Sequence, residues 1–535
     1  MKKLSKTSFL RQESIHLNKM KFFQNPAPRT FSEEPSPDKR EDNSNDKIED
    51  PPAIVRIISG FLGKYFCDRK SLKSKLNGDA ETERHELPQE NIKRVCSKKT
   101  KGVSYGFNKR EITSLKAHGN TDYNDFLDHN QEPFFNQVED KGRWNLAAEA
   151  CEDAINACTQ AGIRLYQKED YVTSQLLTDE TKLVNAIRNS VAEPWNCELI
   201  WGCTRSLLDP GFQSSCLPRL EDGGTAVTSA TISLPFSTVN AFYTKNGLPV
   251  EQDANYYKDG MYFPVKYSKD NSEFTEHYDF DYNYRYVIEN ETTAGMNFDR
   301  EPRFYASVGF DRGVWYGNSY SDPAGDQSES QAAYRYPRNR FGEFSSVWNS
   351  TWYNVTGYWA KKLVALRSTF TGSDNVSFYS VPFPDMRYAD LLLMAAEAWN
   401  EAEETPNEKV YDYLDQVRER AGLEGIKETY AKYASVQYKD YPSHKSQMRD
   451  IIHRERQVEL SCEGSYYWDT RRWKTAEKEL NRIVQGWNVL NGETAEDYYI
   501  PTNIYNQQFT LRDYFAPIPD GDIIRNPQLV QNPWW

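Results

Sequence analysis

One stretch, residues 383–473, constrains the fold of this 535-residue chain more than any other. In its first part, apolar side chains recur at steps of three and four, which places one apolar stripe along a helix. The stripe consists of Tyr388, Leu391, Leu392, Ala395, Ala398, Trp399 and Ala402. Pro384 precedes this segment and Thr405-Pro406 follows it, so both ends are marked. The pattern therefore predicts an amphipathic helix between the two prolines.

Two further helices are predicted after this one. The second contains Val410, Tyr413, Leu414 and Val417 and stops at Ala421-Gly422, where glycine suits the left-handed position past a helix end. The short connection predicts an antiparallel helical hairpin of tetratricopeptide type. The third runs from Met448 to about Cys462. Arg456 and Glu459 are interleaved with its apolar face, so we expect these charges to be paired with one another inside the packing.

Four motifs, in order along the chain, resemble the SusD/RagB family, the surface glycan-binding lipoproteins of Bacteroidetes-type polysaccharide utilisation systems. They are RYADLLLMAAEAWNE, VRERAGL, the ER..EL..EG....D..RW arrangement from Glu455 to Trp473, and the terminal PIPDGDIIRNPQLVQNPWW. The chain departs from the family pattern at Tyr466, where arginine is usual, and at Thr470, where leucine is usual. The resemblance implies a mainly α fold, a tetratricopeptide-like α-α superhelix with a long loop-rich insertion that contains short strands.

Charge divides the chain into two regions. Residues 1–118 hold 25 Lys and Arg against 16 Asp and Glu, a net charge of +9, whereas the remainder carries −22. This contrast, with repeated prolines and no sustained periodicity, predicts an atypical, largely disordered basic N-terminal region over 1–118. One hypothesis is that a frame change or a mistaken upstream start has replaced the true beginning. The rival hypothesis is a divergent arm that is basic enough to touch an anionic surface.

Residues 119–535 are predicted to form the SusD/RagB-like body. Within it we expect helices at about 140–195, a loop-rich insertion at 217–370, C-terminal helical hairpins over 384–490 and an extended tail over 491–535. The first predicted helix has Trp144, Ala147, Ala148, Cys151, Ala154, Ile155 and Cys158 on one face and breaks at Gly162. The last helix of the hairpin region is expected over 473–487.

Several function classes are disfavoured by the sequence. An acidic body repels nucleic acid. The eight cysteines form no Cys-x-x-Cys pair, and no histidines stand at metal spacing, so we expect no metal, although Cys197, Cys203 and Cys216 leave a disulfide open. No catalytic motif is present, and we expect no cofactor and no enzyme activity.

A calcium loop is a weaker alternative. Asp279, Asp281 and Asn283 match its first ligand positions, but Tyr284 replaces the turn glycine and Asn290 replaces the closing glutamate. We favour the exposed edge of an alternating strand instead.

Aromatic residues make up 14 % of the chain, including 35 Tyr and 13 Trp. Their rings offer apolar faces with a polar edge, on which a sugar ring can stack, although packing in the interior is the competing interpretation. The candidate glycan-binding residues, all in the insertion, are Tyr262, Tyr282, Tyr284, Trp315, Tyr316, Tyr320, Trp348 and Trp352. The charged residues of the helical motifs are predicted to be scaffold ion pairs: Arg387, Glu397, Arg456, Glu459, Asp469 and Arg472.

The resemblance implies non-catalytic binding of oligosaccharide or polysaccharide at the cell surface, and delivery to a TonB-dependent SusC-like transporter. It also implies a lipid-anchored position on the extracellular face of the outer membrane, although no signal peptide or lipidation box is readable in this chain. Two alternatives stay open: a tetratricopeptide-type scaffold for protein partners, and a glycan-degrading enzyme whose carboxylate pair is assembled only in space.

Overall fold

The computed structural model describes residues 126–134, 138, 140–204, 210–220, 228–317, 334–347, 352–370 and 376–535. Chain contacts separate Met1–Asp50 from Pro51–Trp535, and every described residue belongs to the second unit. The predicted basic region 1–118 lies outside the described residues.

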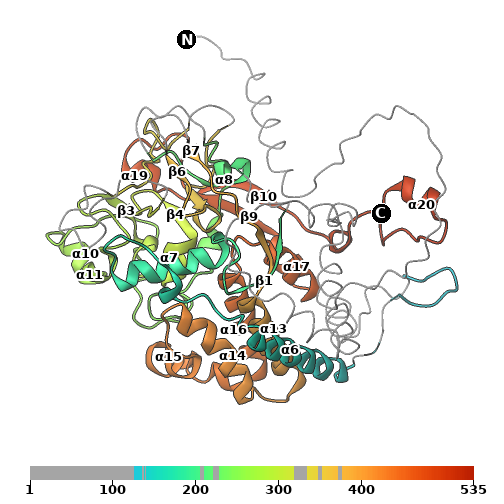
Figure 1. Cartoon of the computed structure of the whole chain (residues 1–535). Helices are drawn as coiled ribbons and strands as arrows, with labels where there is room; N and C mark the ends of the chain where they lie inside the picture. The colour runs from blue at the N-terminus through green and yellow to red at the C-terminus, as the bar shows by residue number, and fades with distance from the viewer. Residues whose placement is uncertain are drawn as a thin grey trace, which may run out of the picture. The chain divides into compact units, whose positions relative to one another are not determined.

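Helix α13 (Tyr388–Ala402) is the centre of the helical part of the structure. It packs against α6 (Gly142–Gln160), α14 (Glu408–Arg420) and α16 (Lys445–Glu459), and the four helices lie together in Figure 1. Most side chains of α13 are buried, including Leu391, Leu392 and Leu393. Because helices contact it on several sides, α13 is apolar around more of its circumference than a surface helix would be.

Helices α13 and α14 form the predicted antiparallel hairpin. The Asn407 side chain accepts a hydrogen bond from the Val410 N–H and so caps the start of α14. The helix ends at Ala421, and Gly422 follows in the left-handed region with φ +79°. Helix α15 (Ile426–Tyr433) then packs against α14. The prediction of a tetratricopeptide-like helical arrangement is confirmed.

Helix α6 confirms the first predicted helix, with Trp144, Ala147, Ala148, Cys151 and Cys158 buried on one face. Helix α7 (Asp179–Ala192) follows, and its cap Thr178 accepts a hydrogen bond from the Thr181 N–H. No disulfide bond joins the cysteines that the structure describes.

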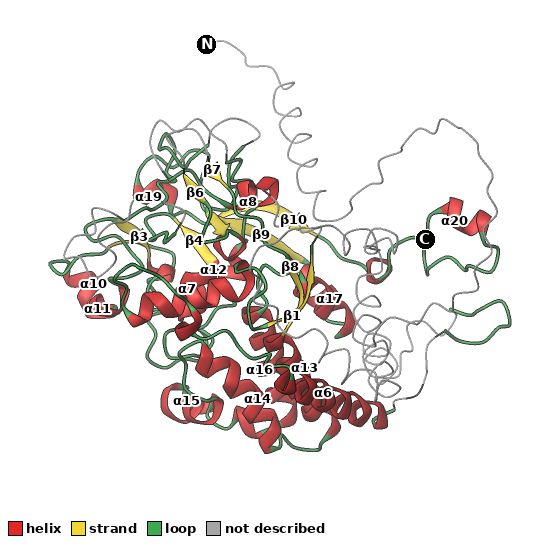
Figure 2. Ribbon diagram, viewed as in Figure 1, coloured by secondary structure: helices red, strands yellow, loops and turns green. Residues whose placement is uncertain are grey.

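The loop-rich part, which we define as residues 210–370, consists of short elements joined by irregular segments, drawn mostly as loops in Figure 2. Its helices are α8 (Pro210–Cys216), α9 (Phe236–Val239), α10 (Ser272–His277), α11 (Phe280–Asn283) and α12 (Pro302–Ser307). Its strands are β2 (Pro264–Lys266), β3 (Thr292–Ala294), β4 (Val308–Phe310), β5 (Tyr358–Ala360) and β6 (Thr369–Phe370).

The strands pair as antiparallel two-stranded sheets. Within the loop-rich part β2 pairs with β3, and β4 with β5, whereas β6 pairs with β7 (Val376–Ser377). Strand β1 (Leu199–Cys203) precedes this part and pairs with β8 (Phe383–Arg387), which follows it. This pairing brings together the two ends of the insertion at the start of α13.

The described part of the molecule has two main apolar cores. One lies among the helices α6, α13, α14 and α16. The other fills the loop-rich part and includes the fully buried rings of Trp315, Trp359 and Trp487. The loop-rich part is therefore a packed body with its own interior, because it buries large aromatic rings where regular elements are short.

The C-terminal region corrects one prediction. The helix expected over 473–487 is wrong: α17 (Ser465–Arg472) and α18 (Ala476–Leu480) are short, and Arg482–Gly486 forms strand β9. This strand pairs with β10 (Thr502–Gln507), and Gly486 lies opposite Thr502. Pairing with a distant segment overrode the local helical pattern. The predicted tail also contains α19 (Ala495–Tyr498) and α20 (Asp520–Arg525), and Tyr498 and Tyr499 are buried.

Candidate functional site

The six predicted scaffold residues are buried and ion-paired, in two clusters. In the first cluster, Arg472 places Nη2 2.6 Å from Oε2 of Glu397 and Nε 2.6 Å from Oδ1 of Asp469. Arg456 places Nε 2.9 Å from Oδ2 of Asp469. The cluster joins α13, α16 and α17, which are the helices that carry the family-like motifs.

The second cluster is built around Arg387. Its guanidinium lies 2.6 Å from Glu198, 2.8 Å from Glu459 and 2.8 Å from Glu463. Glu459 is also paired with Arg420. Burial by itself would raise the pKa of Glu459, but the surrounding cations outweigh burial and hold this pKa below its ordinary value. The carboxylate is therefore ionised in the interior.

The second cluster extends into the loop-rich part. Arg303 of α12 lies 2.7 Å from Glu301 and 2.5 Å from Glu455 of α16. Lys362 lies 2.7 Å from Glu463. These pairs fix the loop-rich part against the helices, so the two parts form one rigid support for any site at the surface.

The predicted glycan-binding residues divide by exposure. Tyr262 and Trp352 are exposed, by 40 % and 41 %. Tyr282 and Tyr284 are half-buried, whereas Trp315 and Tyr316 are buried. Tyr320 and Trp348 lie outside the described residues.

Tyr262 is an exposed ring held from below by buried aromatic residues. The centroid of the Tyr262 ring lies 6.0 Å from the ring centroid of Phe236 and 6.3 Å from that of Trp487. The Asn240 Nδ2 group donates a hydrogen bond of 3.2 Å to its hydroxyl, and the adjacent Phe263 is 63 % exposed. The ring is thus positioned by packing, and apolar surface is available beside it for a ligand.

Trp315 and Tyr316 belong to the interior and do not offer ring faces to a surface ligand. Trp315 is 2 % exposed, and its ring centroid lies 5.5 Å from the Arg188 guanidinium and 5.6 Å from Nζ of Lys361. The Tyr316 carbonyl accepts a hydrogen bond from Arg188, and its ring lies 5.6 Å from Tyr334. For these two residues the interpretation as core aromatics holds.

Tyr282 is also held by contacts within the protein. Its hydroxyl donates a 2.6 Å hydrogen bond to the Arg300 carbonyl, and Lys245 lies over its ring. Asp279 caps α11 by accepting from the Tyr282 N–H, and it is paired with Lys245 at 3.0 Å. The Lys245 ammonium therefore already pairs with Asp279, the carboxylate that would be the first ligand of a calcium loop. In the described part of the chain, no group of three or more metal-ligating side chains comes together.

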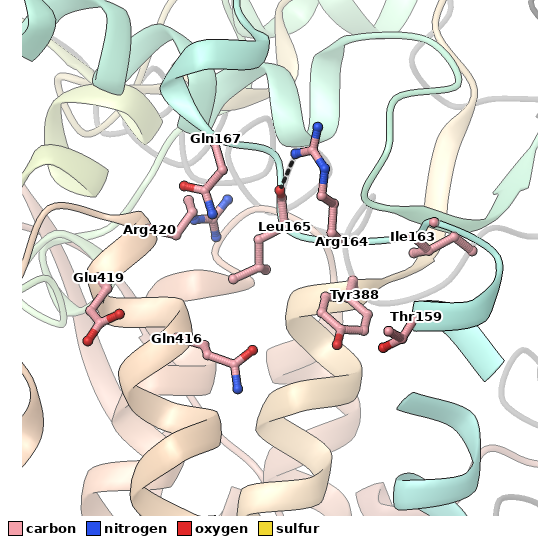
Figure 3. A pocket seen from close by; sticks show the side chains of 10 residues that line it. Thr159, Ile163, Arg164, Leu165, Gln167, Tyr388, Gln416, Glu419 and Arg420 are labelled. Carbon is pink, nitrogen blue, oxygen red and sulfur yellow. Dashed lines mark hydrogen bonds between the residues drawn. The ribbon is translucent and has the colours of Figure 1, made fainter. Parts of the chain in front are cut away.

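A pocket of about 490 Å³ lies in the helical part, away from the predicted aromatic set. It is formed where α6 ends and the chain continues to Gln167, and it is closed by the start of α13 and the last turns of α14. Figure 3 shows Tyr388 beside Thr159 on one wall and Gln167 beside Arg420 on the other. The full lining is Thr159, Gly162, Ile163, Arg164, Leu165, Gln167, Tyr388, Gln416, Glu419 and Arg420.

This pocket was not predicted from the sequence. The pocket draws its lining from three segments that are more than 200 residues apart at their extremes, and no local pattern connects them. The only sequence signal was Gly162, which marked the end of α6 and adopts φ +76° with open space around its Cα.

In the part of the chain that the structure describes, no helix combines the length and apolar composition required to cross a membrane.

The candidate site is an exposed aromatic surface on the packed loop-rich part, which is supported by tetratricopeptide-like helices. Together they define a binding protein on a helical scaffold.

This chain belongs to the SusD family, whose family model matches residues 210–535. Proteins of this family are non-catalytic glycan-binding proteins.

Among similar proteins, the SusD-like protein P2 of Formosa agariphila is 31 % identical over 153 residues. The match covers 29 % of this chain and 26 % of that protein, so the chain matches about a quarter of that relative's length.

Solved structures give the fold. The structure of BT4246 aligns with a TM-score of 0.64 at 23 % identity and covers 81 % of this chain and 73 % of that chain. A SusD-like protein from Bacteroides fragilis, BF3747, aligns with a TM-score of 0.49 at 18 % identity and covers 75 % of this chain and 66 % of that one. The likeness to BT4246 supports the helical scaffold and its loop-rich insertion.

Proposed function

We propose that this protein binds oligosaccharide or polysaccharide at the outer-membrane surface, without catalysis, and delivers it to a TonB-dependent SusC-like transporter. Membership in the SusD family supports the glycan as ligand. The observation that carries the proposal is the exposed ring of Tyr262, held by Phe236, Trp487 and Asn240, with Phe263 exposed beside it.

Binding in this proposal uses stacking and hydrogen bonding. The exposed apolar faces of Tyr262 and Phe263 cover a sugar ring, and the polar edge of the tyrosine meets its hydroxyl groups. Trp352 is a second exposed ring, and it precedes Asn354, whose amide donates to the carbonyls of Ile232 and Tyr358. These hydrogen bonds anchor the segment that carries the tryptophan to the core. Because the rings are already positioned, little ordering entropy is lost on binding.

Affinity electrophoresis in gels that contain individual glycans tests this proposal. The wild-type chain should be retarded by at least one glycan, and Tyr262→Ala and Trp352→Ala should each restore much of the mobility. Trp195→Ala is the matched control, because Trp195 is 57 % exposed but lies in the turn after α7, outside the loop-rich part. Retardation by no glycan, or equal loss in the control, would contradict the proposal.

Two further measurements separate the alternatives. Incubation of the pure protein with the retarding glycan should release no new reducing ends, whereas a glycan-degrading enzyme would release them. Co-purification with the TonB-dependent transporter encoded nearest to this gene, from the native outer membrane, tests the delivery step. A chain that fractionates without that transporter would contradict delivery while leaving glycan binding intact.

A further inference from the structure

Arg338 is an exposed arginine of the loop-rich part, and buried neighbours fix its backbone. Its N–H donates to the Ser345 hydroxyl at 3.0 Å, and its carbonyl accepts from the Ser345 N–H at 2.9 Å. The next residue is Asn339, whose N–H donates to Oδ1 of Asp311 at 2.8 Å. Because Ser345, Asn339 and Asp311 are all buried, the Arg338 side chain extends from a firmly held backbone.

Two aromatic rings position the guanidinium group of Arg338. Its central carbon lies 5.2 Å from the ring centroid of Tyr336 and 5.8 Å from that of Phe344. Nη2 also donates a 2.6 Å hydrogen bond to the Tyr336 hydroxyl. A guanidinium group held by cation–π contacts and a hydrogen bond has less side-chain freedom to lose when a ligand binds.

The carboxylates around this loop are already bound by another arginine, Arg312. Its Nη1 lies 2.6 Å from Oδ1 of Asp311, its Nη2 2.6 Å from Oε1 of Glu343, and its Nε 3.1 Å from Oε2 of Glu291. Among the described residues, Arg338 has no ion-pair partner, and its Nε and Nη1 groups donate to no acceptor. Arg338 is therefore an accessible cation with donors available to a ligand.

Arg367 shows the contrasting arrangement within the same loop-rich part. It is also exposed, and its guanidinium carbon lies 5.4 Å from the ring centroid of Tyr379. Its Nη2, however, is paired with Oε1 of Glu193 at 2.6 Å. The two arginines thus share exposure and a tyrosine contact, and they differ in whether the protein supplies a carboxylate.

We infer that Arg338 binds an anionic group of the glycan, either the carboxylate of a uronic acid or a sulfate ester. Both groups offer oxygens that a guanidinium group binds through charge-assisted hydrogen bonds. The inference rests on the proposed function, since it takes the ligand to be a glycan, and it adds that the glycan is acidic.

The charge of the whole chain makes a local cation necessary for such a ligand. The net charge of −13 repels an acidic glycan, but salt screens this repulsion beyond about 8 Å at physiological ionic strength. Groups at the contact therefore decide whether an acidic sugar residue is accepted. Arg338 supplies a positive charge there that no protein carboxylate of the described residues neutralises.

Isothermal titration calorimetry of the full chain with matched oligosaccharides tests the inference. Oligogalacturonate and oligoalginate are each compared with their carboxyl-reduced products, and a sulfated oligogalactan is compared with its desulfated product. The wild type should bind at least one acidic oligosaccharide about tenfold more tightly than the uncharged counterpart. A preference within a uronate pair identifies a carboxylate as the bound group, and one within the sulfated pair identifies a sulfate ester.

The decisive variant is Arg338→Gln. It should weaken binding of the acidic oligosaccharide about tenfold and leave binding of the uncharged counterpart unchanged, because only the charged contact is lost. Arg338→Lys should restore part of the affinity, since it keeps the charge without the planar fork. Arg367→Gln is the matched control and should change neither affinity. All three variants should keep the thermal midpoint of the wild type, since both positions are exposed.

Salt gives a second readout. Raising NaCl from about 50 to about 500 mM should weaken binding of the acidic oligosaccharide by the wild type more than by Arg338→Gln. The inference is overturned if Arg338→Gln and Arg367→Gln bind that oligosaccharide equally well, or if the wild type binds only uncharged oligosaccharides. In both cases glycan binding itself stands. Binding of no oligosaccharide in any pair also overturns the inference, and retardation by glycans in gels then decides separately whether the proposed function stands.

Discussion

Nη1 of Arg387 lies 2.8 Å from Oε1 of Glu459, with both side chains almost completely buried. Arg387 ends strand β8 and Glu459 ends helix α16, so this pair joins two segments 72 residues apart. Glu198, from before the loop-rich part, shares the same guanidinium. The ends of the insertion and the third helix therefore meet at one buried ionic centre.

Removing the negative charge at this centre should destabilise the protein strongly. Glu459→Gln removes one of the two carboxylates that Arg387 and Arg420 share, the other being that of Glu198, and loss of one partner from a buried pair costs about 3–5 kcal/mol. Urea denaturation followed by tryptophan fluorescence measures the change. The exposed Glu428→Gln should change the free energy of unfolding by less than about 0.5 kcal/mol. Equal effects of the two variants would contradict the structural role of the centre.

Gly422 ends α14 with φ +79°, and a Cβ atom there would lie 2.7 Å from Leu183 Cδ2. Gly422→Ala should therefore lower the free energy of unfolding by about 1 kcal/mol or more, through backbone strain and the close contact. Gly521→Ala is the control, because that glycine lies in α20 with open space around it and no positive φ. It should be neutral or slightly stabilising in the same denaturation experiment.

His453 predicts a pH dependence of stability. Burial lowers its pKa to about 3 from the ordinary 6.5, against the opposing charge of Glu397. Between these two values the unfolded chain binds the proton more readily than the folded chain does, so stability falls as the pH falls. The ring is stacked on Trp473 at 3.5 Å, and His453→Phe keeps that stacking without a titrating group.

The measurement compares urea denaturation at pH 7 and pH 5. The wild type should lose on the order of 1 kcal/mol more than His453→Phe between these two values. The buried carboxylates with lowered pKa, Glu459 and Glu463, lose their contribution only below their ordinary value of 4.5, so they do not obscure this window. An equal loss in both proteins would show that His453 titrates normally.

The exposed and buried aromatic candidates should behave in opposite ways. Trp315→Ala removes a ring from the core and should cost about 3–5 kcal/mol of stability. Tyr262→Ala should leave the thermal midpoint nearly unchanged and weaken glycan binding by about 1 kcal/mol, roughly fivefold in Kd. Differential scanning fluorimetry and affinity electrophoresis on the same samples separate the two effects. A stable Trp315→Ala protein with reduced glycan affinity would contradict the assignment of Trp315 to the core.

Most of the helical part could be predicted from the sequence. The spacing of Leu391, Leu392 and Ala395 and the Gly422 signal predicted α13, α14 and their hairpin, since periodicity and end signals are local properties. The charges of Arg456 and Glu459 on an apolar face predicted a buried pair between these two residues. Both are buried, but Arg456 pairs with Asp469 and Glu459 pairs with Arg387, because the partners come from other segments. The strand over 482–486 was missed because its partner lies at 502–507, beyond any local window.

The candidate sites were decided by tertiary structure. Tyr262 and Trp315 look alike in the sequence, as aromatic residues among polar neighbours in a long insertion, but one is exposed and the other fills a core. Burial depends on which distant segments pack against a ring, and composition carries no information about that. The same holds for the pocket, where Thr159, Tyr388 and Gln416 meet only because α6, α13 and α14 pack side by side. The sequence by itself determined the helices, their ends and the family resemblance, whereas only the tertiary packing decided which side chains are available to a ligand.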